Sequence, residues 1–304
     1  MSNLLQGKTI AIVGLGLMGG SLALALRRAG LPGEEGALIG VARREETVSQ
    51  ALADHIVDEA TTGLAAGVRQ ADIIVLSTPV RTIVDQIYTL RELAQNHQLK
   101  PGVLITDMGS TKVEICAALA SLPETVQAVG GHPMCGKETA GLDAAEANLY
   151  DGATYVLCPL SRTSPEAVSL AEALVDAVSA HAIRLDPVRH DRLVGAISHL
   201  PYLLSCALVA AVDNIGREDE TVWQLAASGF RDTSRLASSD VRMMVDILLT
   251  NREPVLEMVQ RLQAELDSII ELLQMGQPEL LAGVLASVRL VRNEWVARRN
   301  PMDL

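Results

Sequence analysis

The sequence predicts an α/β domain with a mainly parallel sheet, followed by an all-helical domain. In residues 1–186, short aliphatic strands alternate with stretches of helical spacing, the pattern of a parallel sheet covered by helices on both faces. In residues 187–304 the strand pattern is lost, and apolar residues recur every three or four positions, as on one face of a helix. We therefore predict two domains that meet between Asp186 and Pro187.

Composition and charge exclude several classes of protein. The 304 residues, 49% of them hydrophobic, are enough for two hydrophobic cores. A net charge of −12 disfavours nucleic acid and anionic membrane surfaces as partners and favours a small-molecule ligand. The four cysteines have no zinc-site spacing, and the N-terminus has no signal-peptide pattern. We expect free thiols, no metal site, and a cytoplasmic protein.

Seven segments of the first domain have the aliphatic or β-branched character of strands. They are residues 9–16, 37–42, 72–78, 103–109, 126–131, 155–159 and 182–186. Helical stretches separate most of them. One begins with Ser164 as N-cap and Pro165 at the first helical position, and Asp186 and Pro187 repeat that pair at the start of the helical domain.

A glycine-rich turn follows the first predicted strand. Gly14, Gly16 and Gly19 fit the G-x-G-x-x-G pattern, with Leu17 and Met18 inside it, and the pattern opens a helix. In a strand-turn-helix context these glycines allow a tight turn, close approach to a pyrophosphate, and helix–strand packing. We therefore predict a Rossmann-type dinucleotide site; a glycine turn without ligand is the alternative.

The end of the second strand indicates which dinucleotide binds. NAD sites usually carry an acidic residue there, whereas the 2′-phosphate of NADP needs cations. Here the strand ends in Ala42, and Arg43 and Arg44 follow. Two guanidinium groups could bind a phosphate, so we predict a preference for NADP, with NAD possible. The alternative is that both arginines are ordinary surface charges.

Four polar segments follow strands or lie beyond the predicted domain boundary. They are residues 106–112, 130–141, 189–201 and 229–240. Ligands of open α/β sheets bind beyond the carboxyl ends of the strands, where the first two segments fall. The other two supply histidine and arginine from the helical domain. We expect the four segments to line a cleft between domains.

Six motifs in one order resemble the prephenate and arogenate dehydrogenases of tyrosine biosynthesis. They are GLGLMGGS (14–21), STP (77–79), D-x-GS-x-K (107–112), GGHPM-x-G (130–136), SHLP (198–201) and GF-x-D-T-S-R (229–235). The resemblance covers nearly the whole chain. It implies a Rossmann domain, with Ser77, Thr78 and Pro79 at the cofactor, and an all-helical dimerisation domain that forms a homodimer.

The implied activity is oxidative decarboxylation of a cyclohexadienyl substrate. The product is 4-hydroxyphenylpyruvate from prephenate, or tyrosine from arogenate. Relatives that carry a regulatory domain or a chorismate mutase need more chain than these 304 residues, so we expect a short form without either. Any inhibition by tyrosine would then act at the active site.

This chemistry needs a group that manages one hydroxyl proton while the ring carbon gives up hydride. His132 is the candidate, because an imidazole with a pKa near 6.5 accepts a proton at working pH. We expect Ser110 to orient His132 or the hydroxyl. We also expect His132 on a glycine-rich turn, with the glycines of residues 130–141 leaving clearance for a nicotinamide and a ring. The alternative is a loop histidine that bonds its own backbone.

The carboxylates of the substrate need cations with fixed geometry, for which arginine is suited. Arg235 matches the family's substrate-binding arginine, and Arg231 lies one helical turn before it; surface ion pairs are the alternative. His190 and His199 match family positions and either touch substrate or are core residues. At Tyr202, family members known for prephenate often have a second histidine, so this position favours the NADP-using arogenate branch without excluding prephenate.

Two other functions agree with parts of this sequence. A β-hydroxyacid dehydrogenase combines a similar glycine motif with a helical domain, but it needs a catalytic lysine, and no lysine follows Pro187. A dinucleotide-sensing binding protein is the other alternative.

The apolar run at 200–212 is too short to span a bilayer of roughly 30 Å. We predict that it forms a helix buried at a dimer interface.

Overall fold

The first part of the chain forms one sheet in the order β3-β2-β1-β4-β5-β6-β7-β8. The computed structural model describes residues 4–137 and 139–299. Its strands are β1 (Thr9–Val13), β2 (Ala37–Val41), β3 (Glu59–Thr61), β4 (Ile73–Leu76), β5 (Leu104–Asp107), β6 (Gln127–Pro133), β7 (Thr154–Pro159) and β8 (His181–Arg184). Neighbouring strands are parallel except β6 and β7, which are antiparallel. The predicted fold class is confirmed.

All seven predicted strands are present, with two differences. β3 was not predicted, because its three residues carry no run of apolar side chains. β6 extends beyond the predicted segment, since antiparallel pairing with β7 sets His132 opposite Val156 and Pro133 opposite Tyr155. The expectation that His132 lies on a turn is therefore wrong: it lies in the last part of a strand.

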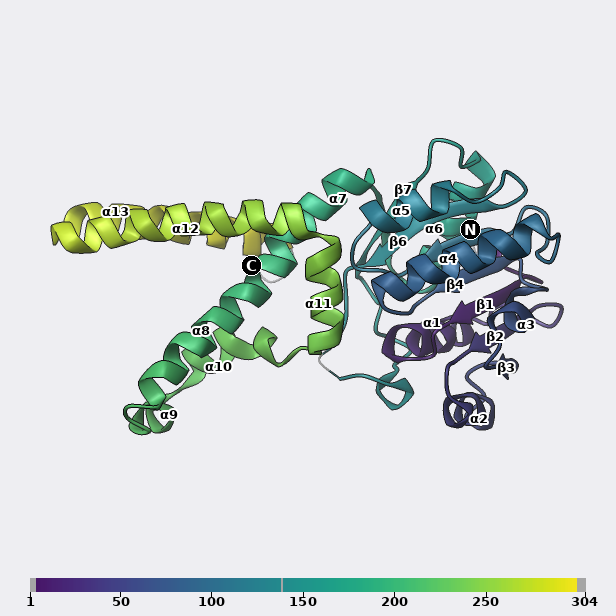
Figure 1. Cartoon of the computed structure of the whole chain (residues 1–304), viewed down its shortest axis with the longest axis horizontal. Coiled ribbons are helices and arrows are strands. Elements are labelled where there is room, and N and C mark those ends of the chain that lie inside the picture. The colour runs from purple at the N-terminus through teal and green to yellow at the C-terminus, as the bar shows by residue number, and fades with distance from the viewer. Residues whose placement is uncertain (1–3, 138, 300–304) are drawn as a thin grey trace. The chain divides into compact units, whose positions relative to one another are not determined.

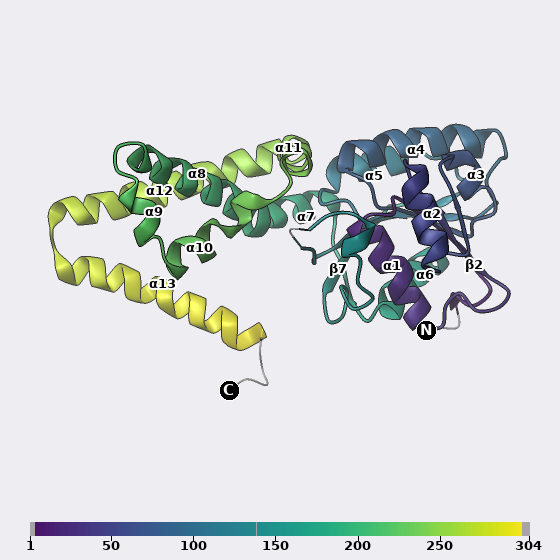
Figure 2. The same cartoon turned by 90° about the horizontal axis from the view of Figure 1, so that it is seen from below.

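Helices cover both faces of this sheet (Figures 1 and 2). One face is covered by α1 (Leu17–Arg28), α2 (Glu45–Ala53) and α6 (Pro165–Ala177), and the other by α3 (Leu64–Val68), α4 (Val80–Gln95) and α5 (Val113–Ala120). Each layer has its own cluster of buried aliphatic side chains, so the sheet is the centre of a three-layer structure. A short 3₁₀ helix, η2 (Leu142–Ala144), packs against α1.

The two predicted helix starts are confirmed. The Ser164 hydroxyl accepts a hydrogen bond from the Ala167 N–H at the start of α6, and the Asp186 carboxylate accepts one from the Arg189 N–H. In both helices proline occupies the first turn, where the missing N–H costs no hydrogen bond. The helical part therefore begins directly after β8.

After β8, the described residues form helices only. They are α7 (Pro187–Val194), the π-helical η3 (Gly195–His199), α8 (Leu200–Gly216), α9 (Thr221–Leu225), α10 (Ser228–Ser234), the 3₁₀ helix η4 (Arg235–Ser238), α11 (Val241–Thr250), α12 (Arg252–Met275) and α13 (Pro278–Arg299). The chain through Val255 packs as one compact unit, and the residues from Leu256 on form a second. The boundary at 186/187 lies between β8 and α7 and stays a prediction.

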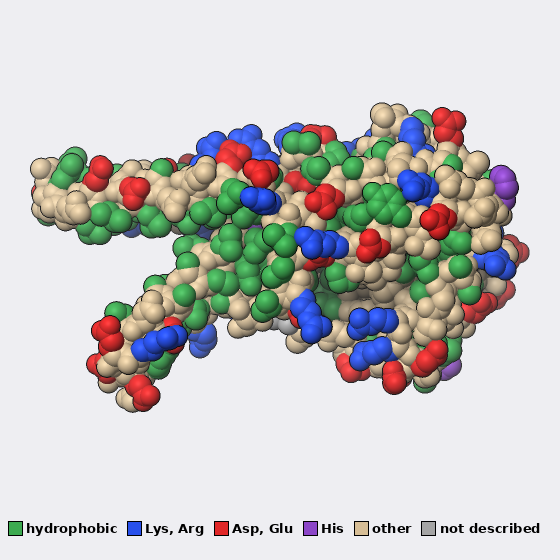
Figure 3. Space-filling view, in the orientation of Figure 1, with side chains coloured by type: hydrophobic (Ala, Val, Ile, Leu, Met, Phe, Trp, Pro, Cys, Tyr) green, Lys and Arg blue, Asp and Glu red, His purple; other side chains and the backbone are tan. Residues whose placement is uncertain are grey.

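α8 carries many apolar side chains that a single protomer leaves exposed (Figure 3). Leu204 is 41% and Ile215 54% exposed, so the expected buried helix is largely uncovered in one chain. By length and composition alone, the continuous helical run Pro187–Gly216 could cross a membrane. The run nevertheless holds buried His190 and His199, which are hydrogen-bonded to other elements of the fold. These bonds favour a helix of a folded domain.

Candidate active site

The glycine turn after β1 has the backbone geometry that a dinucleotide site needs. Gly14 has φ +106°, and a Cβ there would stand 2.7 Å from the Ser77 carbonyl oxygen. A Cβ on Gly19 would overlap the carbonyl oxygen of Gly14, whereas a Cβ on Gly16 would meet no atom of the described residues within 4 Å. Gly14 and Gly19 thus hold the turn against α1 and β4, and Gly16 faces open space.

This turn lies where the order of the sheet reverses. β1 is flanked by β2 and β4, and ligands of doubly wound sheets bind at such a point. Within the described part of the chain no side chain caps the N-terminus of α1, so its first N–H groups can bind a phosphate. Leu17 is buried, and the Met18 carbonyl accepts a hydrogen bond from the Tyr150 hydroxyl at 2.6 Å. The residues present therefore fit a nicotinamide dinucleotide.

The Ser77-Thr78-Pro79 segment follows β4 and supports the turn. The Ser77 hydroxyl donates to the Gly14 carbonyl at 2.6 Å, and the Thr78 hydroxyl donates to Oε1 of Gln86 at 2.8 Å. Pro79 is the N-cap of α4. The Ser77 side chain is thus engaged in shaping the glycine turn.

The end of β2 exposes two arginines. Ala42 is buried, and its N–H donates to the Thr61 carbonyl at 3.1 Å. Arg43 is exposed and has no hydrogen bond or ion pair with any described residue. Arg44, the N-cap of α2, donates from Nη2 to the Thr47 hydroxyl at 3.4 Å. Both guanidinium groups are accessible to an anion beyond this strand.

A buried ion pair joins β5, β6 and the start of α5. The carboxylate of Asp107 and the ammonium of Lys112 are both fully buried and in direct contact. Lys112 Nζ also donates to the Gly131 carbonyl at 2.5 Å, and Asp107 Oδ2 accepts from the Gly131 N–H at 3.0 Å. A Cβ on Gly131 would overlap the Asp107 carbonyl, and one on Gly130 would stand 2.6 Å from Cys116 Sγ. These two glycines therefore make room for neighbouring protein atoms, and the expected clearance for a nicotinamide stays a prediction.

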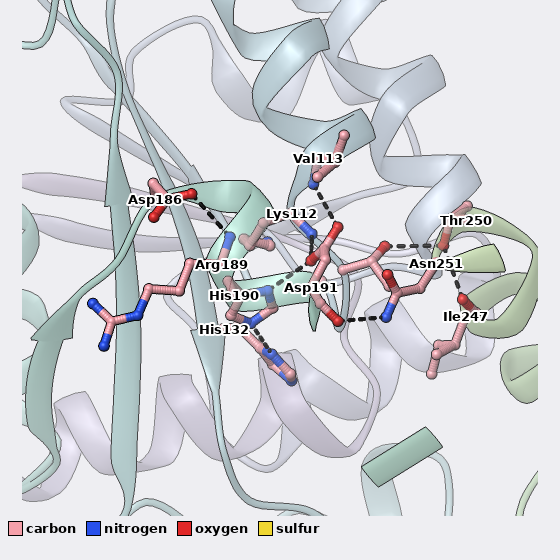
Figure 4. Close-up of polar contacts among 12 residues, drawn as sticks. Lys112, Val113, His132, Asp186, Arg189, His190, Asp191, Ile247, Thr250 and Asn251 are labelled. Carbon is pink, nitrogen blue, oxygen red and sulfur yellow. Dashed lines mark hydrogen bonds and ion pairs between the residues drawn. The ribbon is translucent and has the colours of Figure 1, made fainter. Parts of the chain in front are cut away.

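His132 lies next to His190 of α7 (Figure 4). Nδ1 of His132 is 2.8 Å from Nε2 of His190, and the two rings meet edge to face at 5.0 Å between centroids. Nδ1 of His190 is in turn 2.7 Å from Oδ1 of Asp191. The His132 ring is half-buried, and its Nε2 has no hydrogen-bond partner among the described residues.

His199 belongs to the same polar cluster. Its Nδ1 accepts from the Asn251 amide at 2.9 Å, and the same amide nitrogen donates to the Asp191 carbonyl at 2.8 Å. Oδ1 of Asn251 is buried without a partner in the described part of the chain. Of the predicted histidines, the structure thus brings His132, His190 and His199 together.

Burial keeps two of these imidazoles neutral. The pKa of His132 is held well below its ordinary value, first by desolvation and then by the nearby His190, Lys112 and His199. Burial also lowers the pKa of His199 to about 4. At neutral pH, His132 is therefore an uncharged imidazole that can accept a proton.

The remaining predicted site residues are Ser110, Tyr202, Arg231 and Arg235. Ser110 follows β5 and makes no hydrogen bond to His132 among the described residues. Tyr202 is buried in an apolar cluster, where burial and a hydrogen bond to Cys206 raise its pKa. Arg231 is exposed and paired with the adjacent Asp232, and Arg235, at the start of η4, is exposed. Their predicted substrate roles stay predictions.

The sequence interpretation gave no role to Asp107, Lys112, Asp191 or Asn251. Three of them lie in segments that the motifs already marked, next to Ser110 or His190. Their importance was not visible there, because it arises from contacts between residues far apart in the chain. Asn251 lies outside every motif and had no such signal.

Two family models match this chain. Residues 22–184 match the nucleotide-binding domain of prephenate dehydrogenase, and residues 186–287 match its dimerisation domain. The prephenate dehydrogenase of Bacillus subtilis is 35% identical over 262 residues, which are 86% of this chain and 69% of that protein.

Solved structures give the same relationship. Aquifex aeolicus prephenate dehydrogenase, in complex with hydroxyphenyl propionate and NAD⁺, superposes with a TM-score of 0.85 at 30% identity, over 94% of this chain and 98% of that one. Synechocystis arogenate dehydrogenase gives a TM-score of 0.79 at 33% identity, over 94% and 99% of the two chains. The likeness therefore extends through both the sheet and the helices.

Proposed function

The chain belongs to the prephenate dehydrogenase family, and on this premise we propose that it converts prephenate or arogenate by oxidative decarboxylation, with NADP as the preferred cofactor. It is an oxidoreductase of tyrosine biosynthesis that uses a nicotinamide dinucleotide. The observation that carries the proposal is His132. This neutral imidazole lies at the same edge of the sheet as the glycine turn, because β1, β4, β5 and β6 run parallel.

His132 would accept the proton of the substrate hydroxyl. When bound, the nicotinamide takes up the hydride that leaves the ring carbon. The electron pair of the O–H bond forms the carbonyl as the proton moves to the imidazole. Loss of the ring carboxylate as CO2 returns an electron pair through the ring to this oxygen, which takes its proton back from His132 as a phenol hydroxyl. The histidine is therefore unchanged after one turnover, and the ring is aromatic.

The arginines of α10 and η4 are assigned the binding of the substrate carboxylates. Arg231 and Arg235 are both exposed, and a guanidinium group binds a carboxylate through two parallel hydrogen bonds. His190 and His199 are buried in the polar cluster around His132 and are assigned to the support of the site, and Ser110 is assigned to the orientation of the hydroxyl. Tyr202, where relatives known for prephenate often have histidine, favours arogenate over prephenate.

The preference for NADP is supported by the end of β2. Ala42 offers no carboxylate to repel a 2′-phosphate, and Arg43 has no partner among the described residues that would compete for its guanidinium group. Thr47 and Arg44 lie beside it, at the start of α2. Two cations at this position fit a phosphate better than a ribose hydroxyl.

The helical domain, residues 187–304, is proposed to form a homodimer. Supporting this, α8 exposes Leu204 and Ile215 in one protomer, and exposed apolar faces of this kind are covered in assemblies. We place the dimer in the cytoplasm. A small anionic substrate, and neither nucleic acid nor membrane, is its proposed partner.

A steady-state assay tests the function directly. Prephenate and arogenate are each mixed with NAD and NADP, and reduction of the cofactor is followed at about 340 nm. We expect the highest kcat/KM with arogenate and NADP. His132→Asn should lower kcat by on the order of 10²–10⁴, the contribution of a general base, with little change in cofactor affinity. The absence of turnover with all four pairs would reject the proposal.

A further inference from the structure

An unbroken chain of hydrogen bonds links His132 to the N-terminus of α5 (Figure 4). The two carboxylate oxygens of Asp191 accept from the backbone N–H groups of Lys112 and Val113 at 2.6 and 2.8 Å. His190 bridges this carboxylate to His132, with distances of 2.7 Å on one side and 2.8 Å on the other. Asp191 and His190 are each 1% exposed, so water competes little for these bonds.

The direction of each bond follows from the groups involved. Three N–H donors converge on the Asp191 carboxylate, which as an ionised group can only accept. His190 must therefore donate from Nδ1, and a neutral imidazole then has its lone pair on Nε2. His132 must donate from Nδ1 to that lone pair, which leaves its own lone pair on Nε2.

The surroundings favour this neutral arrangement. Among the described residues, the charged and titratable groups that act on these two rings are Asp191, Lys112 and His199. The Lys112 ammonium opposes further positive charge at His132, and His199 stays neutral at working pH. A proton added to His132 would occupy Nε2 and remove its free lone pair.

We propose that Asp191 and His190 are positioning residues that hold His132 in the tautomer with a proton on Nδ1 and a lone pair on Nε2. The tautomer is inferred from the hydrogen bonds, whereas its role in catalysis depends on the proposed function. Nε2 is the atom that receives the hydroxyl proton and returns it to the phenol oxygen. While His132 holds that proton, its Nδ1–H donates to His190 as a charge-assisted bond, and the Asp191 carboxylate stabilises the positive charge through His190.

The tautomer can be measured without turnover. The full-length protein is labelled with ¹⁵N in its histidine rings, and two-bond ¹H–¹⁵N correlations at pH 7.5 report which nitrogen carries the proton. The His132 signals are assigned by their loss in His132→Asn. In the wild type we expect the proton of His132 on Nδ1. In His190→Ala we expect it on Nε2 or exchanging between the two nitrogens.

Kinetics then test the consequence. Loss of the bond to a charged imidazolium should lower kcat of His190→Ala by roughly 10- to 100-fold, with both KM values within about threefold of wild type. In His190→Gln the amide oxygen can accept from the Nδ1–H of His132 at a similar reach, so kcat should return to within about fivefold of the wild-type value. His181→Ala, an exposed histidine of β8, is the matched control and should change neither kcat nor tautomer.

Several outcomes would overturn the proposal. A wild-type His132 with its proton on Nε2, or a His190→Ala variant with an unchanged tautomer and kcat, contradicts it. If His190→Ala does not fold, the wild-type spectrum and the His190→Gln variant test the proposal in its place. A folded His190→Gln variant that keeps the tautomer of His132 but loses all kcat contradicts the positioning role. A wild type that turns over no substrate pair rejects the proposed function, while the spectrum still reports the tautomer.

Discussion

The ammonium of Lys112 and the carboxylate of Asp107 form an ion pair with no exposed surface, at the carboxyl edge of the sheet. The same two side chains hold both backbone polar groups of Gly131, the residue before His132. The position of the candidate base is therefore set by a pair of buried charges that lie five residues apart in the chain. Removing either partner leaves the other charge buried without compensation.

Replacing Lys112 by methionine should lower the free energy of unfolding by roughly 3–5 kcal/mol, because the Asp107 carboxylate would remain buried and unpaired. Urea denaturation measures the change. Lys100→Ala is the control: its ion pair with Asp72, at 3.2 Å, is partly exposed, so the loss should stay below about 1 kcal/mol. A similar loss in both variants would contradict the assigned importance of the buried pair.

Alanine at Gly19 and at Gly16 should have different effects. Gly19→Ala forces a methyl group against the Gly14 carbonyl and should cost about 1–3 kcal/mol of stability. Gly16→Ala meets open space, so stability should change by less than about 0.5 kcal/mol. We expect it nevertheless to raise the Kd for NADP by about tenfold or more, because the methyl group would separate the backbone from the pyrophosphate. Titration calorimetry and denaturation together test this; unchanged NADP affinity in Gly16→Ala would place the dinucleotide elsewhere.

Arg43→Ala should raise the KM for NADP by roughly 10- to 100-fold, the effect of losing a hydrogen-bonded charge on the 2′-phosphate, and leave the KM for NAD nearly unchanged. Steady-state kinetics with each cofactor measure both values. Arg69→Ala removes the same charge from the exposed end of α3 and should affect neither KM. An unchanged KM for NADP in Arg43→Ala would make the two arginines after β2 ordinary surface charges.

Stability should fall as the pH drops below about 6.5. His199 has an ordinary pKa of 6.5 in the unfolded chain and a pKa of about 4 in the folded chain, so between these values the unfolded state binds a proton that the folded state excludes. Between pH 7.5 and 5.0 this histidine should contribute a loss of about 2 kcal/mol, and His132 acts in the same direction. Denaturation at both pH values should show a smaller loss in His199→Gln. His97→Asn, at an exposed position with φ +55°, should lose as much as the wild type.

Leu204→Arg should shift the protein from dimer to monomer, because it places a charge in the exposed apolar face of α8. Sedimentation velocity over a range of concentrations measures the mass. Leu52→Arg, on α2 with a similar exposure of 38%, is the control and should leave the dimer intact. A wild type that sediments as a single chain at every concentration would remove the proposed homodimer.

Much of the fold could be predicted from local pattern. The seven strands, the glycine turn, and the helix starts at Ser164 and Asp186 follow from periodicity and capping, which depend on residues close together in the chain. β3 was missed, because three residues without an apolar pattern give no such signal. The end of β6 was missed for another reason: His132 continues the strand only because β7 returns antiparallel to it.

The sequence by itself determined that a parallel sheet would carry a dinucleotide turn, that a helical domain would follow, and that His132 and two arginines would be available for chemistry. Tertiary structure decided which groups surround His132. Asp191 and His190 reach it from 58 or more positions away, and Lys112 and Asp107 come from a different strand end. Such contacts depend on strand order and helix packing, which no local pattern encodes. The protonation of the His132 imidazole depends in turn on those neighbours.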